Sequence, residues 1–91
     1  MLGHKIRELR EQNQMLLRQL AAQLEIDTAV LSKMERGDRL FQKDDVKALA
    51  GIFNQSEEEL LTLWLADKVL KAMENENYKQ QALKLVLNTL K

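Results

Sequence analysis

Apolar residues recur at helical spacing in the first half of the chain. Positions i, i+3, i+4 and i+7 form one stripe that must face a core, and they are Leu17, Leu20, Ala21 and Leu24. Residues 25–27 break this period. Asp27 is a good N-cap for a following helix, because its carboxylate can accept a free backbone N–H and lies at the positive end of the helix dipole. A second helix is therefore predicted from Thr28 to Gly37, which tolerates the left-handed conformation after a helix end.

The second predicted helix has one face that is free of bulky apolar groups. At about 100° per residue, Leu31, Met34 and Glu35 point one way. The opposite face carries Thr28, Ala29, Ser32, Lys33 and Arg36. A short helix, a three-residue connector and a second helix with a polar face form the outline of a helix-turn-helix unit over residues 17–37, an arrangement that reads DNA.

Similar patterns predict helices elsewhere in the chain. An opening helix over residues 2–12 places Ile6 and Leu9 inward. A later helix starts near Asp44 and carries an apolar stripe formed by Val46, Leu49, Ala50 and Phe53. The predicted fold is all-α: a compact bundle of about five helices that contains the helix-turn-helix, plus a C-terminal helix or helical hairpin.

The C-terminal part holds more apolar residues than one helix face can bury. Ser56 followed by Glu59 is a capping-box pattern that starts a helix. Its apolar residues occupy more than one stripe, and they are Leu60, Leu61, Leu63, Trp64, Leu65, Val69, Leu70 and Met73. After a polar break at residues 74–77, helical spacing returns at Leu83, Val86, Leu87 and Leu90. Because the break lacks Gly and Pro, the sequence allows one long helix or two helices paired as a hairpin.

This surplus of apolar surface predicts a second subunit. We expect the interface of a homodimer to contain Trp64, Leu65, Val69, Leu83, Val86, Leu87 and Leu90, although Trp64 also fits the core. Residues 1–65 are predicted to form the DNA-binding domain, and residues 66–91 a helical extension for dimerisation within the same compact unit. A two-fold dimer would place two recognition helices about 34–36 Å apart and predicts a palindromic DNA site.

Charge is balanced overall and uneven along the chain. The 91 residues include 14 Lys or Arg and 14 Asp or Glu, which gives a net charge of zero. Residues 1–43 carry eight basic and six acidic side chains, whereas residues 44–91 carry six basic and eight acidic ones. Since the basic half coincides with the helix-turn-helix, binding to a polyanion should depend on a local basic patch.

Composition argues against catalysis and against a membrane. The chain has no cysteine, one histidine, no Gly-rich phosphate loop and no metal-ligand cluster, so we expect no enzyme, no cofactor and no metal. The absence of cysteine fits a reducing cytoplasm. No apolar segment approaches the about 18 residues of a membrane span, and no leader precedes the fold, so we expect a soluble cytoplasmic protein.

Four segments of the chain carry a family resemblance. IRELRE, LAAQLEID, LSKMERG and VKALAGIF follow one another between Ile6 and Leu60. In this order and at these separations they resemble the repressor-type helix-turn-helix family of phage and bacterial regulators, the lambda and 434 repressor or Xre-like group.

The resemblance implies a set of DNA contacts. In that family the second helix of the motif lies in the major groove, which implies that Thr28, Ala29, Ser32 and Lys33 approach base edges. Lys33 suits the O6 and N7 acceptors of guanine, Thr28 and Ser32 can donate or accept, and Ala29 can touch a thymine methyl group. The loop over residues 38–43 would follow the sugar-phosphate backbone, and the residues expected to contact that backbone are Arg10, Arg36, Arg39 and Lys43.

Arg10 and Glu35 resemble a family pair that joins the first helix to the recognition helix. Two other positions depart from the family pattern. Glu25 stands in the connector where the family often has glycine, which predicts a strained or differently shaped turn. Leu17 stands where the family commonly has a glutamine that meets a phosphate, so one backbone contact should be missing.

Two functions remain open from the sequence. The first is a sequence-specific regulator of transcription that binds double-stranded DNA as a dimer and represses by occupying its operator. The second is a protein-binding module, such as an antitoxin, which grips a partner through the C-terminal helices while DNA binding is secondary. Neutral overall charge and Leu17 favour the second function slightly.

Overall fold

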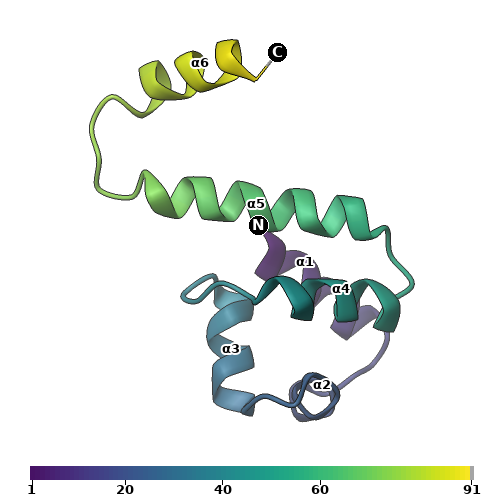
Figure 1. The fold of residues 1–91 in the computed structure, drawn as a ribbon. Coiled ribbons are helices and arrows are strands. Elements are labelled where there is room, and N and C mark those ends of the chain that lie inside the picture. Colours follow the sequence, from purple (N-terminus) through teal and green to yellow (C-terminus); the bar gives the residue numbers. More distant parts are fainter. Residues whose placement is uncertain (91) are drawn as a thin grey trace.

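The computed structural model describes residues 1–90, and within this range the fold is all-α with six helices (Figure 1). They are α1 (Leu2–Gln12), α2 (Leu17–Leu24), α3 (Thr28–Arg36), α4 (Lys43–Ile52), α5 (Glu57–Ala72) and α6 (Lys79–Thr89). This confirms the predicted fold class and the predicted positions of α1 to α3. Residue 91, the last of the predicted C-terminal extension, lies outside the described residues.

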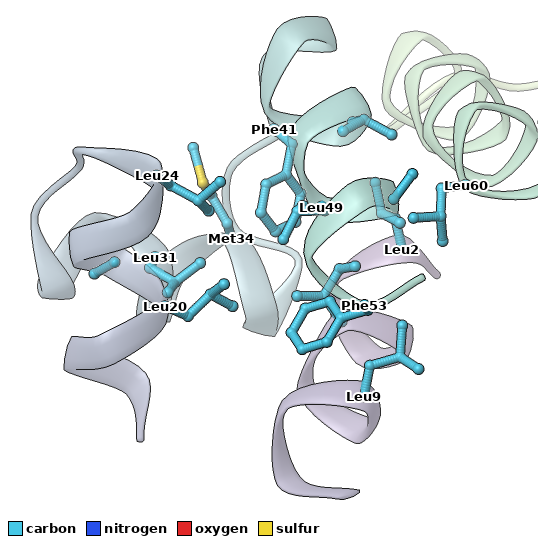
Figure 2. Close-up of a cluster of buried hydrophobic side chains, with 14 residues drawn as sticks. Leu2, Leu9, Leu20, Leu24, Leu31, Met34, Phe41, Leu49, Phe53 and Leu60 are labelled. Atoms are coloured by element: carbon cyan, nitrogen blue, oxygen red, sulfur yellow. The ribbon is translucent and has the colours of Figure 1, made fainter. Parts of the chain in front are cut away.

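Helices α1 to α5 share one hydrophobic core. Figure 2 shows side chains from these helices and from the α3–α4 loop meeting there, with Phe41 and Phe53 among them. Most of the predicted stripe residues are buried, namely Ile6, Leu9, Leu20, Ala21, Leu24, Leu31, Met34, Val46, Leu49, Ala50 and Phe53. Periodicity therefore identified the inward faces of α1 to α4 correctly.

The start of α1 is packed more closely than the sequence pattern indicated. Leu2 and Gly3 are both buried. A Cβ atom on Gly3 would lie 2.7 Å from the carbonyl oxygen of Glu35 and closer still to that of Met34, so α1 needs glycine where it meets the end of α3. From α5, Oδ2 of Asp67 accepts a hydrogen bond from the backbone N–H of Leu2 at 2.9 Å. These contacts tie α1 to both α3 and α5.

Helix ends agree with the sequence in part. Gly37 ends α3 with φ of 85°, as predicted, and Oγ of Ser56 accepts the N–H of Glu59 at 3.2 Å. The prediction for Asp27 was wrong in one respect: it occupies the N-cap position of α3, but its side chain makes no capping hydrogen bond. The start of α4 was also placed one residue too late, because Lys43 belongs to its first turn and not to the preceding loop.

The C-terminal part forms two helices and not one. Helix α5 ends at Ala72 and α6 begins at Lys79, and Figure 1 shows α6 turning back after the intervening loop. Asn75 and Tyr78, both with φ of 64°, reverse the chain without glycine or proline. The pairing of two helices, one of the two predicted alternatives, does not bury the apolar face of α6, because no residue of this helix is buried.

The longest of these helices, α5, packs partly against the core and is partly exposed to solvent. Leu60 is buried, and Leu61, Leu63 and Trp64 pack against the core. The predicted division between residues 65 and 66 falls inside α5 and stays a prediction. None of the helices within residues 1–90 is both long and apolar enough to cross a membrane.

Candidate nucleic-acid interface

One side of α3 is held in the core and the opposite side is open. Leu31, Met34 and Glu35 are buried. Thr28, Ala29 and Lys33 are exposed, and Ser32 is half-buried. These four residues form the set that we call the reading face. The structure therefore brings the predicted base-contacting residues together on the surface of one short helix.

A buried ion pair fixes the inner side of α3. Nε of Arg10 donates to Oε2 of Glu35 at 2.8 Å, and Nη2 of Arg10 donates to Oε1 of Glu35 at 3.0 Å. The third arm, Nη1, donates to the carbonyl oxygen of Met15 at 3.0 Å. Two parallel charge-assisted bonds define both distance and angle between the partners. The pair joins α1 to α3, and the DNA-reading role of α3 stays a prediction.

Burial distinguishes this pair from the other ion pairs within residues 1–90. The Arg10 side chain is 13% exposed and the Glu35 side chain 5% exposed. The hydrogen bond from Arg10 to Glu35 raises the pKa of Arg10 above its usual value, although partial burial acts in the opposite direction. Because the guanidinium is occupied inside the protein, its contact with a DNA phosphate stays a prediction.

Arg36 takes part in a second network, on the surface. Its Nη1 donates to Oγ of Ser32 at 2.9 Å, and its Nε donates to Oδ2 of Asp38 at 3.1 Å. We call Asp38, Arg36 and Ser32 the α3 clamp. The family resemblance placed Arg36 against the DNA backbone and gave no role to Asp38. The i, i+4 spacing of Ser32 and Arg36, followed by an acidic residue just after Gly37, was the available signal.

Two further basic residues follow α3. Arg39 lies in the α3–α4 loop and Lys43 in the first turn of α4, and both are exposed. Within residues 1–90 neither makes an ion pair. Their charges are thus available to a polyanion that approaches α3 from outside.

The first turn of α2 adds a residue that sequence reasoning missed. Leu16 and Arg18 are exposed there, and Oε1 of Gln19 accepts the N–H of Leu16 at 2.7 Å. The first helix of this motif crosses the DNA backbone. Arg18 is a basic residue directly after Leu17, the position where the family commonly has a glutamine that contacts a phosphate. This neighbourhood was the signal that could have identified Arg18.

The connector between α2 and α3 shows which conformation Glu25 adopts at the position where the family often has glycine. Glu25 has φ of 56° and ψ of 42°, the left-handed conformation that glycine adopts most easily. The N–H of Ile26 donates to the carbonyl oxygen of Ala21 at 3.0 Å, which closes the end of α2. The turn therefore keeps a glycine-type conformation with a non-glycine residue.

Trp64 belongs to the intramolecular packing of α5. Its Nε1 donates to the carbonyl oxygen of Phe41 at 2.8 Å, and Nζ of Lys68 lies 4.6 Å from the centre of its rings. The tryptophan borders a groove of about 450 Å³ between the start of α1, the α3–α4 loop and α5. Its part in a subunit interface stays a prediction. No group of three or more histidine, cysteine or acidic residues within residues 1–90 could hold a metal ion.

Two short helices, α2 and α3, joined by a tight connector and with one side of α3 open to solvent, have the arrangement of a helix-turn-helix unit. A family model described as a helix-turn-helix domain matches residues 1–63, from α1 into α5. The match covers more than half of the chain, and the protein belongs to this family, which confirms the resemblance to repressor-type, Xre-like proteins. Comparison with curated proteins and with solved structures gave no match.

Proposed function

We propose that the protein is a sequence-specific regulator of transcription that binds a palindromic operator in double-stranded DNA and represses by occupancy. The observation that supports this proposal is the reading face, which is open to solvent while the opposite side of α3 is fixed by Arg10 and Glu35. A rigid helix with exposed polar groups can enter the major groove without losing conformational entropy in its backbone. Membership of a DNA-binding family supports the same function.

The residues of the interface divide into readers and anchors. Thr28, Ala29, Ser32 and Lys33 are proposed to contact base edges, which discriminates bases by roughly 1–3 kcal/mol for a good direct contact. Anchors contact phosphates and fix the register of the protein on the duplex. We assign this role to Arg39, Lys43, Arg18 and Arg10, whereas Arg36 is paired with Asp38 in the free protein.

A homodimer is the second part of the proposal. In a single copy, large apolar side chains of α5, of α6 and of the residue that follows α6 stay exposed, namely Leu65, Val69, Leu70, Leu85, Val86, Leu87 and Leu90. An accumulation of exposed large apolar side chains on two helices is typical of a protein–protein interface. We propose that a second copy covers these side chains, with Leu83 and Trp64 at the edge, and that the protein works without cofactor or metal in the cytoplasm.

The same surface favours an alternative from another class. An antitoxin-like module would use the apolar faces of α5 and α6 to hold a different protein, and DNA binding would be secondary. The exposed leucines support both assemblies equally. Binding of DNA in the absence of any other protein separates the two functions.

Selection from a random duplex pool, followed by sequencing, tests the proposal. We expect enrichment of a palindromic site and a salt-dependent affinity, which falls about 10³–10⁵-fold between 50 and 200 mM salt for six to ten phosphate contacts. Two substitutions add a matched comparison. Lys33→Ala should relax preference at one position in each half-site, whereas Lys43→Ala should weaken all sequences about equally. No enrichment and no binding at low salt would favour the antitoxin-like module.

A further inference from the structure

We propose that Asp38 and Arg36 are positioning residues that fix Ser32 as a hydrogen-bond donor toward one base, while Asp38 holds Arg36 away from the phosphates. This inference rests on the proposed DNA-binding function and assigns a polarity to one of its readers. It follows from the geometry of the α3 clamp, in which Ser32 Oγ lies 2.9 Å from Nη1 of Arg36.

The direction of the hydrogen bond determines what Ser32 offers to DNA. Arg36 can only donate, so Oγ of Ser32 is the acceptor and its own O–H remains to donate elsewhere. Two other helical hydroxyl groups, those of Thr62 and Thr89, donate to the carbonyl four residues earlier, at 2.7 and 2.9 Å. Within residues 1–90 Ser32 makes no such bond to Thr28. Its proton is free to point out of the helix.

A donor in the major groove distinguishes among bases. Guanine presents N7 and O6 there, adenine presents N7 and thymine presents O4, all of which accept hydrogen bonds. Cytosine presents only the N4 amino group, which donates, whereas adenine carries a donating N6 amino group beside its N7 acceptor. Ser32 held as a donor therefore favours an acceptor-bearing base over cytosine at the position that it faces. A freely rotating serine could instead donate to an acceptor or accept a hydrogen bond from cytosine N4.

Backbone geometry places the carboxylate that completes the clamp. Gly37 adopts φ of 85°, and the N–H of Asp38 donates to the carbonyl oxygen of Lys33 at 2.9 Å. The N–H of Gly37 donates to the carbonyl oxygen of Met34 at 3.1 Å, which completes a Schellman end. Because this turn fixes Asp38 beside the last residue of α3, its carboxylate meets Nε of Arg36 at 3.1 Å.

The clamp affects specificity more than stability. The Arg36 and Asp38 side chains are 55% and 62% exposed, and exposed ion pairs of this kind contribute little to folding. On DNA, however, Asp38 neutralises a guanidinium that would otherwise bind a phosphate. Removing Asp38 should raise affinity for every sequence and weaken discrimination at the base that Ser32 faces.

The first test uses the free protein. The mobility of the Arg36 side chain is measured by ¹⁵N relaxation of its Nε in the wild type and in Asp38→Ala. We expect a restrained Nε in the wild type and a mobile one in the variant. Equal mobility in both proteins would overturn the inference without touching the proposed function.

The second test measures binding to the selected duplex and to its single-base-pair variants. Ser32→Ala identifies the position that Ser32 faces, by a loss of about fivefold or more in discrimination there. We expect Arg36→Gln and Asp38→Ala to lower the discrimination at this same position. The Ser32→Ala/Arg36→Gln double variant should lose no more discrimination there than Ser32→Ala alone. Asp38→Ala should also steepen the salt dependence by about 0.9 for each additional phosphate that the variant neutralises. Arg39→Gln is the control, because it should weaken all duplexes equally.

The outcomes separate the two levels of the proposal. Suppose that the wild type binds DNA but that Ser32→Ala, Arg36→Gln or Asp38→Ala leaves base discrimination unchanged. This result overturns the role of the clamp and leaves the DNA-binding function intact. Failure of the wild type to bind any duplex overturns the proposed function, and the role of the clamp with it. Thermal unfolding of each variant near the wild-type temperature verifies that these comparisons concern binding and not folding.

Discussion

Arg10 and Glu35 connect α1 to α3 through a single pair of side chains. Their bidentate hydrogen bonds join α1 to α3 in a place where water has little access. Removal of one partner leaves the other charge buried and without compensation, which is far more costly than loss of a surface pair. The family resemblance predicted this pair, whereas helical periodicity alone placed Glu35 inward without naming its partner.

Arg10→Ala should lower the free energy of unfolding by about 3–5 kcal/mol, because it leaves the Glu35 carboxylate buried and unpaired. The matched control is Arg7→Ala, which removes an exposed pair with Glu11 on the same helix and should cost less than about 1 kcal/mol. Urea unfolding followed by circular dichroism measures both values. Equal effects of the two substitutions would show that the buried pair has no special part in holding α3.

Glu25 stands in the connector where the family often has glycine, and it adopts the left-handed conformation with φ of 56° and ψ of 42°. A non-glycine residue in the left-handed conformation costs about 1–2 kcal/mol, part of which glycine loses again through its larger entropy in the unfolded chain. Glu25→Gly should therefore stabilise the protein by up to about 1 kcal/mol. As a control, Gln23→Gly within α2 should destabilise it by about 1 kcal/mol. A destabilising Glu25→Gly would mean that the Glu25 side chain stabilises the turn.

At the level of elements, the meeting of α1 with α3 depends on a close backbone approach. Gly3 lies against two carbonyl oxygens at the end of α3, and backbone atoms there cannot move aside as a flexible side chain can. No periodicity in the sequence distinguishes this glycine from Gly51, which lies in α4 with open space around it. The contact between the helices became visible only when both were placed in three dimensions.

Gly3→Ala should destabilise the protein by about 1–3 kcal/mol through steric overlap with α3. Gly51→Ala should instead stabilise it by up to about 1 kcal/mol, since alanine is the better helix former and meets no neighbour. Differential scanning calorimetry of the two variants gives the sign of each change. Stabilisation by both substitutions would contradict the close approach of α1 to α3.

Sequence patterns predicted some elements better than others for physical reasons. Helices α1 to α4 each bury one stripe, and a single stripe is what periodicity detects. The break between α5 and α6 was ambiguous because it contains no glycine or proline. The chain turns there through positive φ at Asn75 and Tyr78, and neither residue type announces this conformation in the sequence. The clamp escaped prediction because Asp38 reaches Arg36 only through the turn at Gly37, although the open side of α3 was identified correctly.

For the whole molecule, the exposed apolar faces of α5 and α6 matter most for stability and for assembly with a second copy. A chain of 91 residues buries only about 60–68% of its unfolded surface and becomes more stable if a partner adds core. In a dimer these faces would both stabilise the protein and set the spacing of two reading faces. Dimer formation and DNA binding are therefore expected to be coupled through geometry.

Leu87→Glu should convert a dimer into a monomer, because it places a charge in the proposed interface while the residue is 62% exposed in the single chain. Lys84→Ala, an exposed substitution on the same helix, is the control and should leave the dimer intact. Analytical ultracentrifugation over a range of concentrations measures the mass of each protein. A monomeric wild type at all concentrations would contradict the dimer.

The most direct test of DNA recognition by α3 is a titration of the ¹⁵N-labelled protein with the selected duplex, followed by amide chemical shifts. We predict that the largest changes occur at residues 28–33 and in the loop that carries Arg39, with smaller changes in α5 and α6. Changes confined to α5 and α6, with α3 unaffected at saturating duplex, would contradict recognition through the reading face.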